Sequence, residues 1–442
     1  MSKIAVVHTY GCIQNENDSE KIRGLLAADG YEQGSDNADA DLIIINTCAI
    51  RDNAETRVYS NLGALRTLKE QKPALLIGVC GCMPQQEHVS EYLKSRFPFV
   101  DIIFGTNTID KLPELLENAV NSRQIAISDE GGIAEGLPQA RNSAITANVS
   151  IMYGCNNFCT YCVVPYVRGR ERSREWEDIV NEVEGLAAAG YKEITLLGQN
   201  VNSYAGGIDF PDLLGRVSEI EGIERIRFIS SHPKDASDKL ISALKNNPKV
   251  CKQLHLPFQS GSASVLADMN RRYTREDYLS LVEKIKAEIP DIALTSDVIV
   301  GFPTETQEDF EDTLDLIKKV GFDMLFTFIF SKRKNTPAYD MPMTLSKERV
   351  KKNFDRLVET QTEISNIKNQ PYLNKIKAVL AEGPSKSNKS ALTGRTEEGK
   401  IVNFAGGKEL IGTVVPVRIT KAGTWSLEGE SLNNNTHLTP QR

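Results

Sequence analysis

Six of the eight cysteines fall into two sets of three, and both sets have residue types and spacings that suit metal chemistry. The compact set is Cys155, Cys159 and Cys162, in the segment GCNNFCTYC. The dispersed set is Cys12, Cys48 and Cys82, in the segments TYGC, NTC and GCMPQ. A [4Fe–4S] cluster is normally held by four cysteine thiolates, so a set of three leaves one iron open to a further ligand. An open coordination site is typical of a reactive centre rather than of a structural one.

Each set also has a plainer interpretation. Zinc is another metal that closely spaced cysteines bind, but it requires a fourth protein ligand nearby, and no second C-x-x-C pair follows the compact set. The dispersed cysteines could instead be three unrelated buried side chains, and Cys80 lies close enough in sequence to Cys82 to replace it in the set. The strands and loops predicted around the cysteines help to decide between a metal site and unrelated buried cysteines.

The first 127 residues alternate apolar runs with helical patterns. Residues 4–7, 42–45 and 75–79 are predicted to be short buried strands, with helices over residues 18–29 and 54–71, a pattern typical of a parallel α/β domain. A cysteine of the dispersed set follows each strand within a few residues. Sites in open α/β sheets form at the carboxyl ends of the strands. The sequence therefore predicts that the three thiols of the dispersed set meet at one edge of the sheet.

A polar, glycine-rich stretch over residues 128–146 is predicted to be a linker, and a repeated strand–helix pattern follows it over residues 147–370. Six strands are fewer than the eight of a closed β/α barrel, so we expect a partial, open barrel. The strands are predicted over residues 149–153, 193–197, 225–230, 253–256, 293–300 and 325–330. The compact cysteine set and the segments GQNVNSY, SSHP, HLPFQSGS and VGFPTET follow these strands, where such barrels place their sites.

The C-terminal part of the chain differs in pattern and in charge. After a helix predicted over residues 346–369, residues 371–442 hold short strands separated by Gly, Pro and Asn, which predicts a small OB-like barrel, a common frame for binding single-stranded RNA. The formal net charge is +4 from Pro371 onward and −11 before it, or −7 in all. A basic end on an acidic protein favours a nucleic-acid partner, although a solvated surface with scattered lysines gives the same charge.

Bulk properties set the wider frame. At 442 residues the chain has room for about three domains, and its apolar and charged fractions, 40% and 25%, are those of an ordinary globular protein. No apolar run approaches the roughly 20 residues of a membrane span, and the N-terminal segment lacks the pattern of a signal peptide. Cysteines at redox-sensitive spacings fit a reducing compartment. We therefore expect a cytoplasmic protein with no membrane partner.

The compact set lies in a segment that resembles the radical S-adenosylmethionine (SAM) superfamily, whose C-x-x-x-C-x-x-C loop follows the first strand of a barrel. The resemblance implies that Cys155, Cys159 and Cys162 hold a [4Fe–4S] cluster and carry the catalysis. It implies that the open iron binds SAM and that one electron splits the bound SAM to a 5′-deoxyadenosyl radical.

Over essentially the whole chain, the sequence is similar to the methylthiotransferases of that superfamily. The similarity lies in TYGC, NTCAIRDNAE, GCMPQ, CNNFCTYCVVPYVRGRERSR, LLGQNVNSY, SSHP, HLPFQSGS, MNRRYT, DVIVGFPTE, TGRTEEGKIVNF and TWSLEGE. It is strongest with the tRNA enzymes that add a methylthio group at C2 of N6-isopentenyladenosine at position 37, beside the anticodon. One alternative is a sister enzyme for N6-threonylcarbamoyladenosine in tRNA or for a ribosomal-protein aspartate. The other is an iron–sulfur RNA-binding protein without catalytic activity.

The resemblance also implies a role for the dispersed set. Cys12, Cys48 and Cys82, rather than Cys80, would hold an auxiliary [4Fe–4S] cluster whose open iron carries the sulfur to be inserted. One SAM would methylate that sulfur, the radical from a second SAM would remove the C2 hydrogen of the adenine, and the carbon radical would take the methylthio group. The implied partners are a tRNA anticodon loop, gripped by a TRAM domain over residues 371–442, and an electron donor such as flavodoxin or ferredoxin.

Polar residues at the ends of the predicted barrel strands are expected to bind SAM, with ordinary loop structure as the alternative for each. They are Gln199, Asn200, Ser231, Gln259, Ser260 and Asp297. His232 and His255 are expected to orient or hydrogen-bond rather than to act as acid or base, since abstraction by a radical requires neither. Four alternating arginines could meet RNA phosphate or the SAM carboxylate, or form a solvated charged segment. They are Arg168, Arg170, Arg172 and Arg174.

Overall fold

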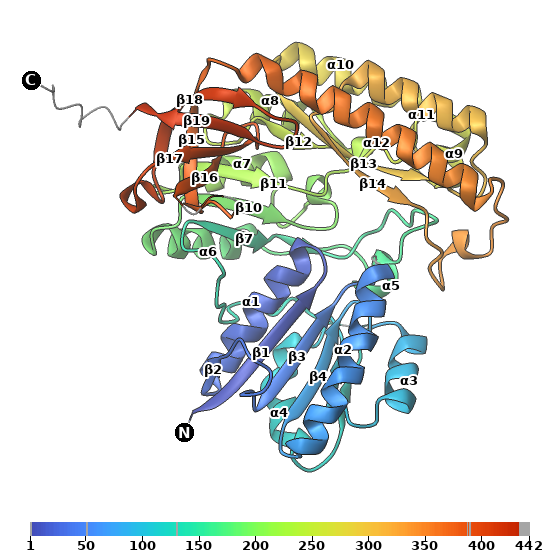
Figure 1. Ribbon diagram of the computed structural model, residues 1–442, viewed down its shortest axis with the longest axis vertical. Coiled ribbons are helices and arrows are strands. Elements are labelled where there is room, and N and C mark those ends of the chain that lie inside the picture. The colour runs from blue at the N-terminus through green and yellow to red at the C-terminus, as the bar shows by residue number, and fades with distance from the viewer. Residues whose placement is uncertain (1, 50–51, 130, 387, 389, 433–442) are drawn as a thin grey trace, which may run out of the picture. The chain divides into compact units, whose positions relative to one another are not determined.

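A computed structural model describes residues 2–49, 52–129, 131–386, 388 and 390–432 (Figure 1). The chain divides into two compact units. The first comprises residues 1–142, 150–174 and 333–336, and the second comprises residues 143–149, 175–332 and 337–442. Parts of three predicted features lie outside the described residues: positions 50 and 51 of the NTCAIRDNAE motif, position 130 of the linker, and positions 387, 389 and 433–442 of the C-terminal domain.

The first unit is built on a six-stranded parallel sheet in the order β2-β1-β3-β4-β5-β6. The strands are β1 (Lys3–Tyr10), β2 (Tyr31–Gln33), β3 (Leu42–Thr47), β4 (Leu76–Gly81), β5 (Ile102–Phe104) and β6 (Gln124–Ala126). The main helices are α1 (Ile13–Ala28), α2 (Asp52–Gln71), α3 (Glu87–Arg96) and α4 (Leu112–Ala119). The central strand β3, LIIINT, is buried along its whole length, as a parallel strand covered on both faces must be.

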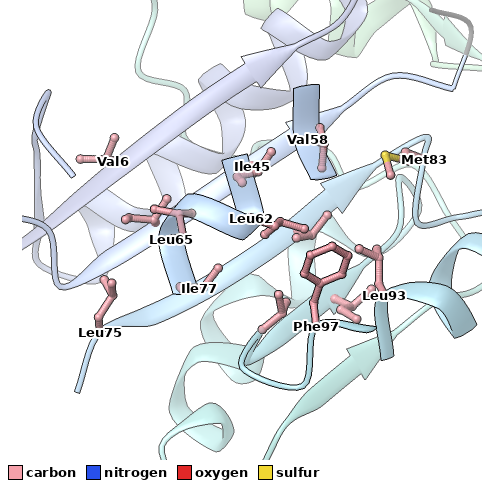
Figure 2. Close-up of a cluster of buried hydrophobic side chains, with 14 of the residues drawn as sticks. Val6, Ile45, Val58, Leu62, Leu65, Leu75, Ile77, Met83, Leu93 and Phe97 are labelled. Carbon is pink, nitrogen blue, oxygen red and sulfur yellow. The ribbon is translucent and has the colours of Figure 1, made fainter. Parts of the chain in front are cut away.

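Helices cover both faces of this sheet because side chains alternate along each strand. On one face, Val6, Ile45 and Ile77 belong to a core that also includes Leu62 of α2 and Leu93 of α3 (Figure 2). The opposite face of the sheet packs against apolar residues of α1 and α4 and forms a second core. This core includes Ala5, Leu42 and Ile44 of the strands, Ile22 and Leu26 of α1, and Leu112 of α4. Two helical layers therefore hold the sheet, and its carboxyl edge remains for the segments that follow the strands.

The second unit contains a partial barrel of two three-stranded sheets, β11-β10-β7 and β12-β13-β14, which confirms the predicted open barrel. A parallel bridge joins Ile226 of β11 to Val250, which precedes β12. The strands are β7 (Thr146–Ser150), β10 (Glu193–Leu197), β11 (Arg225–Phe228), β12 (Gln253–His255), β13 (Ala293–Val300) and β14 (Met324–Ile329). The helices are α6 (Trp176–Ala188), α7 (Phe210–Glu219), α8 (Asp238–Asn246), α9 (Ala263–Asp268), α10 (Arg275–Glu288), α11 (Gln307–Val320) and α12 (Lys347–Asn369).

Five C-terminal strands close a small barrel in the order β15-β16-β17-β19-β18, as the sequence predicts. They are β15 (Ile376–Pro384), β16 (Ala391–Arg395), β17 (Ile401–Ala405), β18 (Val414–Ala422) and β19 (Leu427–Ser431). Alternating residues such as Val402, Phe404, Val415 and Val417 fill its core. Figure 1 shows this barrel beside β10 and β11, within the second unit. No helix in the described part of the chain is both long and apolar enough to span a membrane.

Most predicted boundaries shift by a few residues, and two elements near the cysteines differ more. The strand predicted over residues 149–153 is two strands, β7 and β8 (Met152–Tyr153), and β8 pairs antiparallel with the short strand β9 (Arg172–Ser173). The helix predicted to begin at residue 18 begins at Ile13. Its first turns carry polar residues, so no apolar stripe marks them, although most of those polar side chains are buried.

Candidate iron–sulfur and SAM sites

The dispersed cysteines lie at the carboxyl edge of the first unit's sheet. Cys12 follows β1 and caps the N-terminus of α1, Cys48 follows β3, and Cys82 follows β4. Because β1, β3 and β4 are adjacent parallel strands, these three residues leave the sheet at neighbouring points. The Cys48 thiol hydrogen-bonds the Cys12 sulfur, and Cys12 and Cys82 are close enough to interact electrostatically. The structure therefore brings the three predicted thiols together.

The surroundings of Cys12 favour its thiolate form. The hydrogen bond from Cys48 is the main cause that lowers the pKa of Cys12 to about 5, and the charge of Arg168 and backbone N–H groups at the start of α1 lower it further. Burial raises the pKa of Cys82, while the guanidinium of Arg168 beside it acts in the opposite direction. A thiolate is the form that binds iron, so these surroundings suit Cys12 as a ligand, and Arg168 offsets part of the effect of burial on Cys82.

Cys80 occupies a different environment from Cys82. Its side chain is fully buried in the apolar core beneath α1 and α4, with Ala5, Ile44 and Phe104, and burial raises its pKa well above the ordinary value. Cys82 instead belongs to a small cluster with Ala49, Val163 and Val167, at the edge where the compact set's segment passes. The local chemistry favours Cys82 as a ligand and Cys80 as a core residue.

A buried ion pair joins the segment that carries the compact set to helix α1. The Arg168 guanidinium lies 2.7 Å from the Asp18 carboxylate, and both side chains are more than nine-tenths buried. Arg168 also hydrogen-bonds the Cys82 thiol. One arginine thus contacts a ligand candidate of the dispersed set while it lies a few residues beyond the compact set. Breaking a buried pair of this kind is strongly destabilising because it leaves an uncompensated charge.

Further polar contacts explain why the first turns of α1 are polar and buried. The Gln14 amide donates to the Ser150 hydroxyl at 2.9 Å, and that hydroxyl donates to Asn17 at 2.8 Å. Lys21 donates to the Tyr153 hydroxyl at 2.7 Å. These side chains donate to or accept from the segment that precedes Cys155, which is far away in sequence, so this face of the helix carries polar residues rather than an apolar stripe.

The compact set lies on a tight loop whose backbone is held at both ends. The Cys155 amide donates to the Gly169 carbonyl at 3.1 Å, and the Cys162 amide donates to the Cys159 carbonyl at 2.9 Å. Gly154 has φ +77°, and a Cβ there would lie 2.0 Å from the Arg170 carbonyl oxygen, so only glycine fits.

The sulfurs of this loop are partly shielded from solvent. Cys155 and Cys159 are buried and Cys162 is half-buried. The Asn157 amide lies within 3.5 Å of the Cys155 sulfur, and burial raises the pKa of that thiol. None of the described cysteines forms a disulfide. The loop therefore presents three cysteines that remain available as ligands.

The chemistry of the donor set fits iron–sulfur clusters. Each set consists of three cysteines, and cysteine thiolates are the usual ligands of a [4Fe–4S] cluster. In such a cluster each cysteine binds a different iron, so its ligands surround the cube and need not converge on one point. Two groups of three thiols match that requirement.

Two of the residues predicted to contact SAM carry buried polar atoms with no hydrogen-bond partner among the described residues: Asn200 Oδ1 and Ser231 Oγ. They follow the adjacent strands β10 and β11, and the Val201 amide donates to the Ser230 carbonyl at 3.1 Å between the same two segments. The Asn200 amide nitrogen is held by Asp235 at 2.8 Å. A buried polar atom left without a partner is costly, so this pair is suited to a polar ligand.

The remaining candidates in the second unit are placed differently. Gln259 has φ +68°, and its backbone bonds to Asp297 and Ile299 of β13 at 2.9 and 3.0 Å, which fixes the turn. The Ser260 hydroxyl is buried against Thr313 at 3.4 Å, a contact within the loop and α11. Asp297 is half-exposed, and Gln199 follows β10. Ser260 is therefore the candidate for which a purely structural role in the loop, rather than SAM binding, is best supported.

His232 is unsuited to act as a cationic acid. Burial, followed by the charges of Arg271 and Lys234, lowers its pKa to about 2, so the ring is neutral at physiological pH. Its Nδ1 accepts a hydrogen bond from the Lys234 amide at 3.2 Å. This agrees with the predicted orienting role.

The four alternating arginines all have partners within the protein, although Arg170 is also exposed to solvent. Arg168 pairs with Asp18, and the Arg174 guanidinium lies 2.6 Å from Glu135. Arg170 stacks over the Phe158 ring at 4.2 Å, and Arg172 donates to backbone carbonyls, including that of Arg168 at 3.1 Å. The sequence offered no signal for these partners, which lie up to 150 positions away.

Together, a partial barrel and a C-x-x-x-C-x-x-C loop directly after its first strand define the radical SAM class of enzyme. Residues 149–317 match the radical SAM superfamily, residues 4–105 match uncharacterized protein family UPF0004, and residues 370–432 match the TRAM domain. The solved structure of the radical SAM methyltransferase TsrM from Kitasatospora setae superposes with a TM-score of 0.56 at 14% identity, covering 77% of each chain, which shows a shared fold.

Close relatives cover nearly the whole chain. The tRNA-2-methylthio-N(6)-dimethylallyladenosine synthase of Clostridium perfringens (strain SM101 / Type A) is 53% identical over 436 residues, 97% of each chain. The protein of the same name from Caldicellulosiruptor saccharolyticus is 54% identical over 429 residues, 96% of this chain and 91% of the relative. The chain belongs to this family of radical SAM methylthiotransferases.

Proposed function

We propose that this chain inserts a methylthio group at C2 of N6-isopentenyladenosine in tRNA, at position 37 beside the anticodon. The observation that carries the proposal is 53% identity over 97% of the chain to synthases named for that product. The two groups of three cysteines support it, because sulfur insertion into an unactivated C–H bond calls for cofactor chemistry that side-chain acids and bases lack.

Cys155, Cys159 and Cys162 would hold a [4Fe–4S] cluster as the catalytic ligands, and Cys12, Cys48 and Cys82 would hold an auxiliary one. When bound, the two clusters and SAM supply a radical that removes the C2 hydrogen and a sulfur that is methylated and transferred. The protein's own residues keep these groups apart from water. The thiols are largely buried, and Arg168 places a positive charge beside Cys82, where anionic thiolates and sulfide would gather.

The predicted SAM contacts are Gln199, Asn200, Ser231, Gln259, Ser260 and Asp297. Among them, Asn200 and Ser231 are best suited to bind SAM, because each has a buried oxygen without a hydrogen-bond partner among the described residues. The amino and carboxylate groups of SAM are polar enough to satisfy such atoms. Gln259 would act through the backbone turn that it fixes.

The substrate side of the proposal concerns RNA. The C-terminal barrel would bind the phosphates of the anticodon arm, because residues 370–432 match the TRAM domain and the chain from Pro371 onward has a positive formal net charge. The target adenine must be unstacked, which suits an anticodon loop. A flavodoxin or ferredoxin would supply the electron, and the cytoplasm is the compartment that keeps thiols reduced. We assign residues 1–127 to the auxiliary-cluster domain, 128–146 to a linker, 147–370 to the radical SAM domain and 371–442 to the TRAM domain.

The test is nucleoside analysis after reaction. Full-length protein, reconstituted anaerobically with iron and sulfide, is incubated with SAM, a one-electron reductant and tRNA from a strain that lacks methylthio modification. We expect 2-methylthio-N6-isopentenyladenosine and 5′-deoxyadenosine by mass spectrometry. Methylthio product only on threonylcarbamoyladenosine, or no deoxyadenosine at all, would overturn the proposal.

A triple variant tests whether the two clusters bind independently of each other. Replacing Cys155, Cys159 and Cys162 with Ala should abolish deoxyadenosine while leaving the iron of the auxiliary site in place. Loss of all iron in that variant would contradict two independent clusters.

A further inference from the structure

The inner face of the sheet β12-β13-β14 carries a row of large apolar side chains. Strand register places Met324, Phe326 and Phe328 of β14 opposite Thr295, Asp297 and Ile299 of β13. Since side chains alternate along a strand, these six share one face. Among the alternate residues, Val298 and Leu325 are buried whereas Ile329 at the end of β14 is exposed, and helix α12 packs along β13 and β14 (Figure 1).

The apolar row is unusually exposed. Met324, Phe326 and Phe328 have exposed fractions of 37%, 47% and 45%. They occupy consecutive positions of one face on the last strand of the sheet, so they form a continuous strip rather than scattered single residues. Contiguous exposed apolar surface of this kind marks a binding site more often than a plain surface.

A polar group borders the strip. His255 of β12 is held by Thr295, with Nδ1 and Oγ1 3.0 Å apart, and its Nε2 lies 3.7 Å from the Asp297 carboxylate. The rings of His255 and Phe326 meet edge to face, with centroids 5.7 Å apart. A flat aromatic surface beside hydrogen-bonding groups is what a purine base needs, because a base stacks through its face and bonds through its edge.

The charge on this face discriminates between substituents on the base. The inward positions of the three strands hold one carboxylate, Asp297, and no lysine or arginine. A base that carries a carboxylate at N6 would meet a like charge without a cation to compensate it. An uncharged dimethylallyl group would instead bury its methyls against Phe326 and Phe328.

We infer that Met324, Phe326 and Phe328 form the surface that receives the unstacked adenine and its N6 substituent, and that they select the isoprenoid group over a carboxylate-bearing one. The inference rests on the proposed function and adds the residues that set its substrate class. These residues act by binding and take no part in the radical step.

The test compares two faces of one strand. Phe326→Ala and Phe328→Ala alter the inner face, whereas Ile329→Ala removes a side chain of similar exposure, 47%, from the opposite face of the same strand. For each protein, kcat/KM is measured on tRNA with N6-isopentenyladenosine, N6-threonylcarbamoyladenosine or unmodified adenosine at position 37, and Kd is measured for the matching anticodon stem-loops. Iron content and tRNA-independent SAM cleavage check that each variant is loaded.

We expect Phe326→Ala to lower kcat/KM on isopentenylated tRNA by on the order of tenfold or more, and to reduce its preference over both unmodified and threonylcarbamoylated tRNA in rate and Kd. Ile329→Ala should keep the wild-type preference. If both phenylalanine variants keep that preference as well, the inference is wrong although the proposed function stands. If the wild-type protein does not modify isopentenylated tRNA, the proposed function itself fails.

Discussion

Arg168 and Asp18 form an ion pair of 2.7 Å in the interior of the first unit, although 150 positions separate them in the sequence. Asp18 lies on α1, whose N-terminus is capped by Cys12, and Arg168 lies shortly after Cys162. The pair therefore couples the segment of the compact cysteine set to the edge that carries the dispersed set. Loss of this ion pair should therefore lower both the stability of the fold and the binding of the iron–sulfur clusters.

Removing the arginine alone should be costly. In Arg168→Met the Asp18 carboxylate stays buried without its partner, so we expect unfolding free energy to fall by about 3–5 kcal/mol in urea titrations of the apo protein. The double variant Arg168→Met, Asp18→Leu should regain most of that loss, because an apolar pair can replace a buried ion pair. It should still bind less iron, since the positive charge beside Cys82 is gone. Equal stability of the single variant and the wild type would contradict the role given to the pair.

Iron counts should separate Cys82 from Cys80. Cys82→Ala removes a ligand candidate, so about four of eight iron atoms should be lost after anaerobic reconstitution. Cys80→Ala removes only a core side chain packed with Ile44 and Phe104, so iron should stay near the wild-type count while stability falls by about 1 kcal/mol. Loss of iron in Cys80→Ala with retention in Cys82→Ala would reverse the assignment.

Glu305 should make the stability of the barrel depend on pH. Burial raises its pKa to about 7, even though Oε2 accepts a hydrogen bond from the Gly301 amide at 2.6 Å. The native state therefore prefers the protonated acid. Its contribution to stability is fully present below the unfolded pKa of about 4.3 and is lost as pH rises through about 7.

Glu305→Gln keeps the acceptor oxygen but cannot ionise. Unfolding free energies from urea titrations should be compared at pH 5 and pH 8. The stability of the variant relative to the wild type should be higher at pH 8 than at pH 5, by up to about 3 kcal/mol given the size of the pKa shift. A constant difference between Glu305→Gln and the wild type would rule out this titration.

The sequence anticipated those features that depend on local pattern. The apolar runs of β3 and β13 and the alternation in the C-terminal barrel predicted these strands, and the positions of the cysteines after strands predicted where the thiols gather. It missed the start of α1, because polar residues such as Gln14 and Asn17 signal a solvent-facing surface unless their distant partners are known. The unpartnered oxygens of Asn200 and Ser231 are equally invisible to it, since they depend on packing rather than on residue type.

The last prediction concerns how the C-terminal barrel is held within the second unit. Arg227 of β11 pairs with Glu193 of β10 at 3.0 Å, and both side chains are more than nine-tenths buried. The same guanidinium donates to the carbonyls of Thr396 and Glu397 in the C-terminal barrel, at 2.7 and 3.1 Å. Arg227 is thus shared between an ion pair and the backbone of the C-terminal barrel.

Arg227→Met should leave a buried carboxylate and two carbonyls without their donor, at a cost of about 3–5 kcal/mol. Because the lost bonds connect β11 to the segment between β16 and β17, the C-terminal barrel should loosen first, and limited proteolysis should cut near residue 370 before the rest of the chain unfolds. Lys351→Met, which breaks an exposed pair with Asp355, is the control and should cost no more than about 0.5 kcal/mol. If Arg227→Met resists proteolysis as the control does, then the remaining apolar contacts fix the barrel by themselves. If it is cut early, and tRNA binding weakens in parallel, this one arginine determines how firmly the C-terminal barrel is attached.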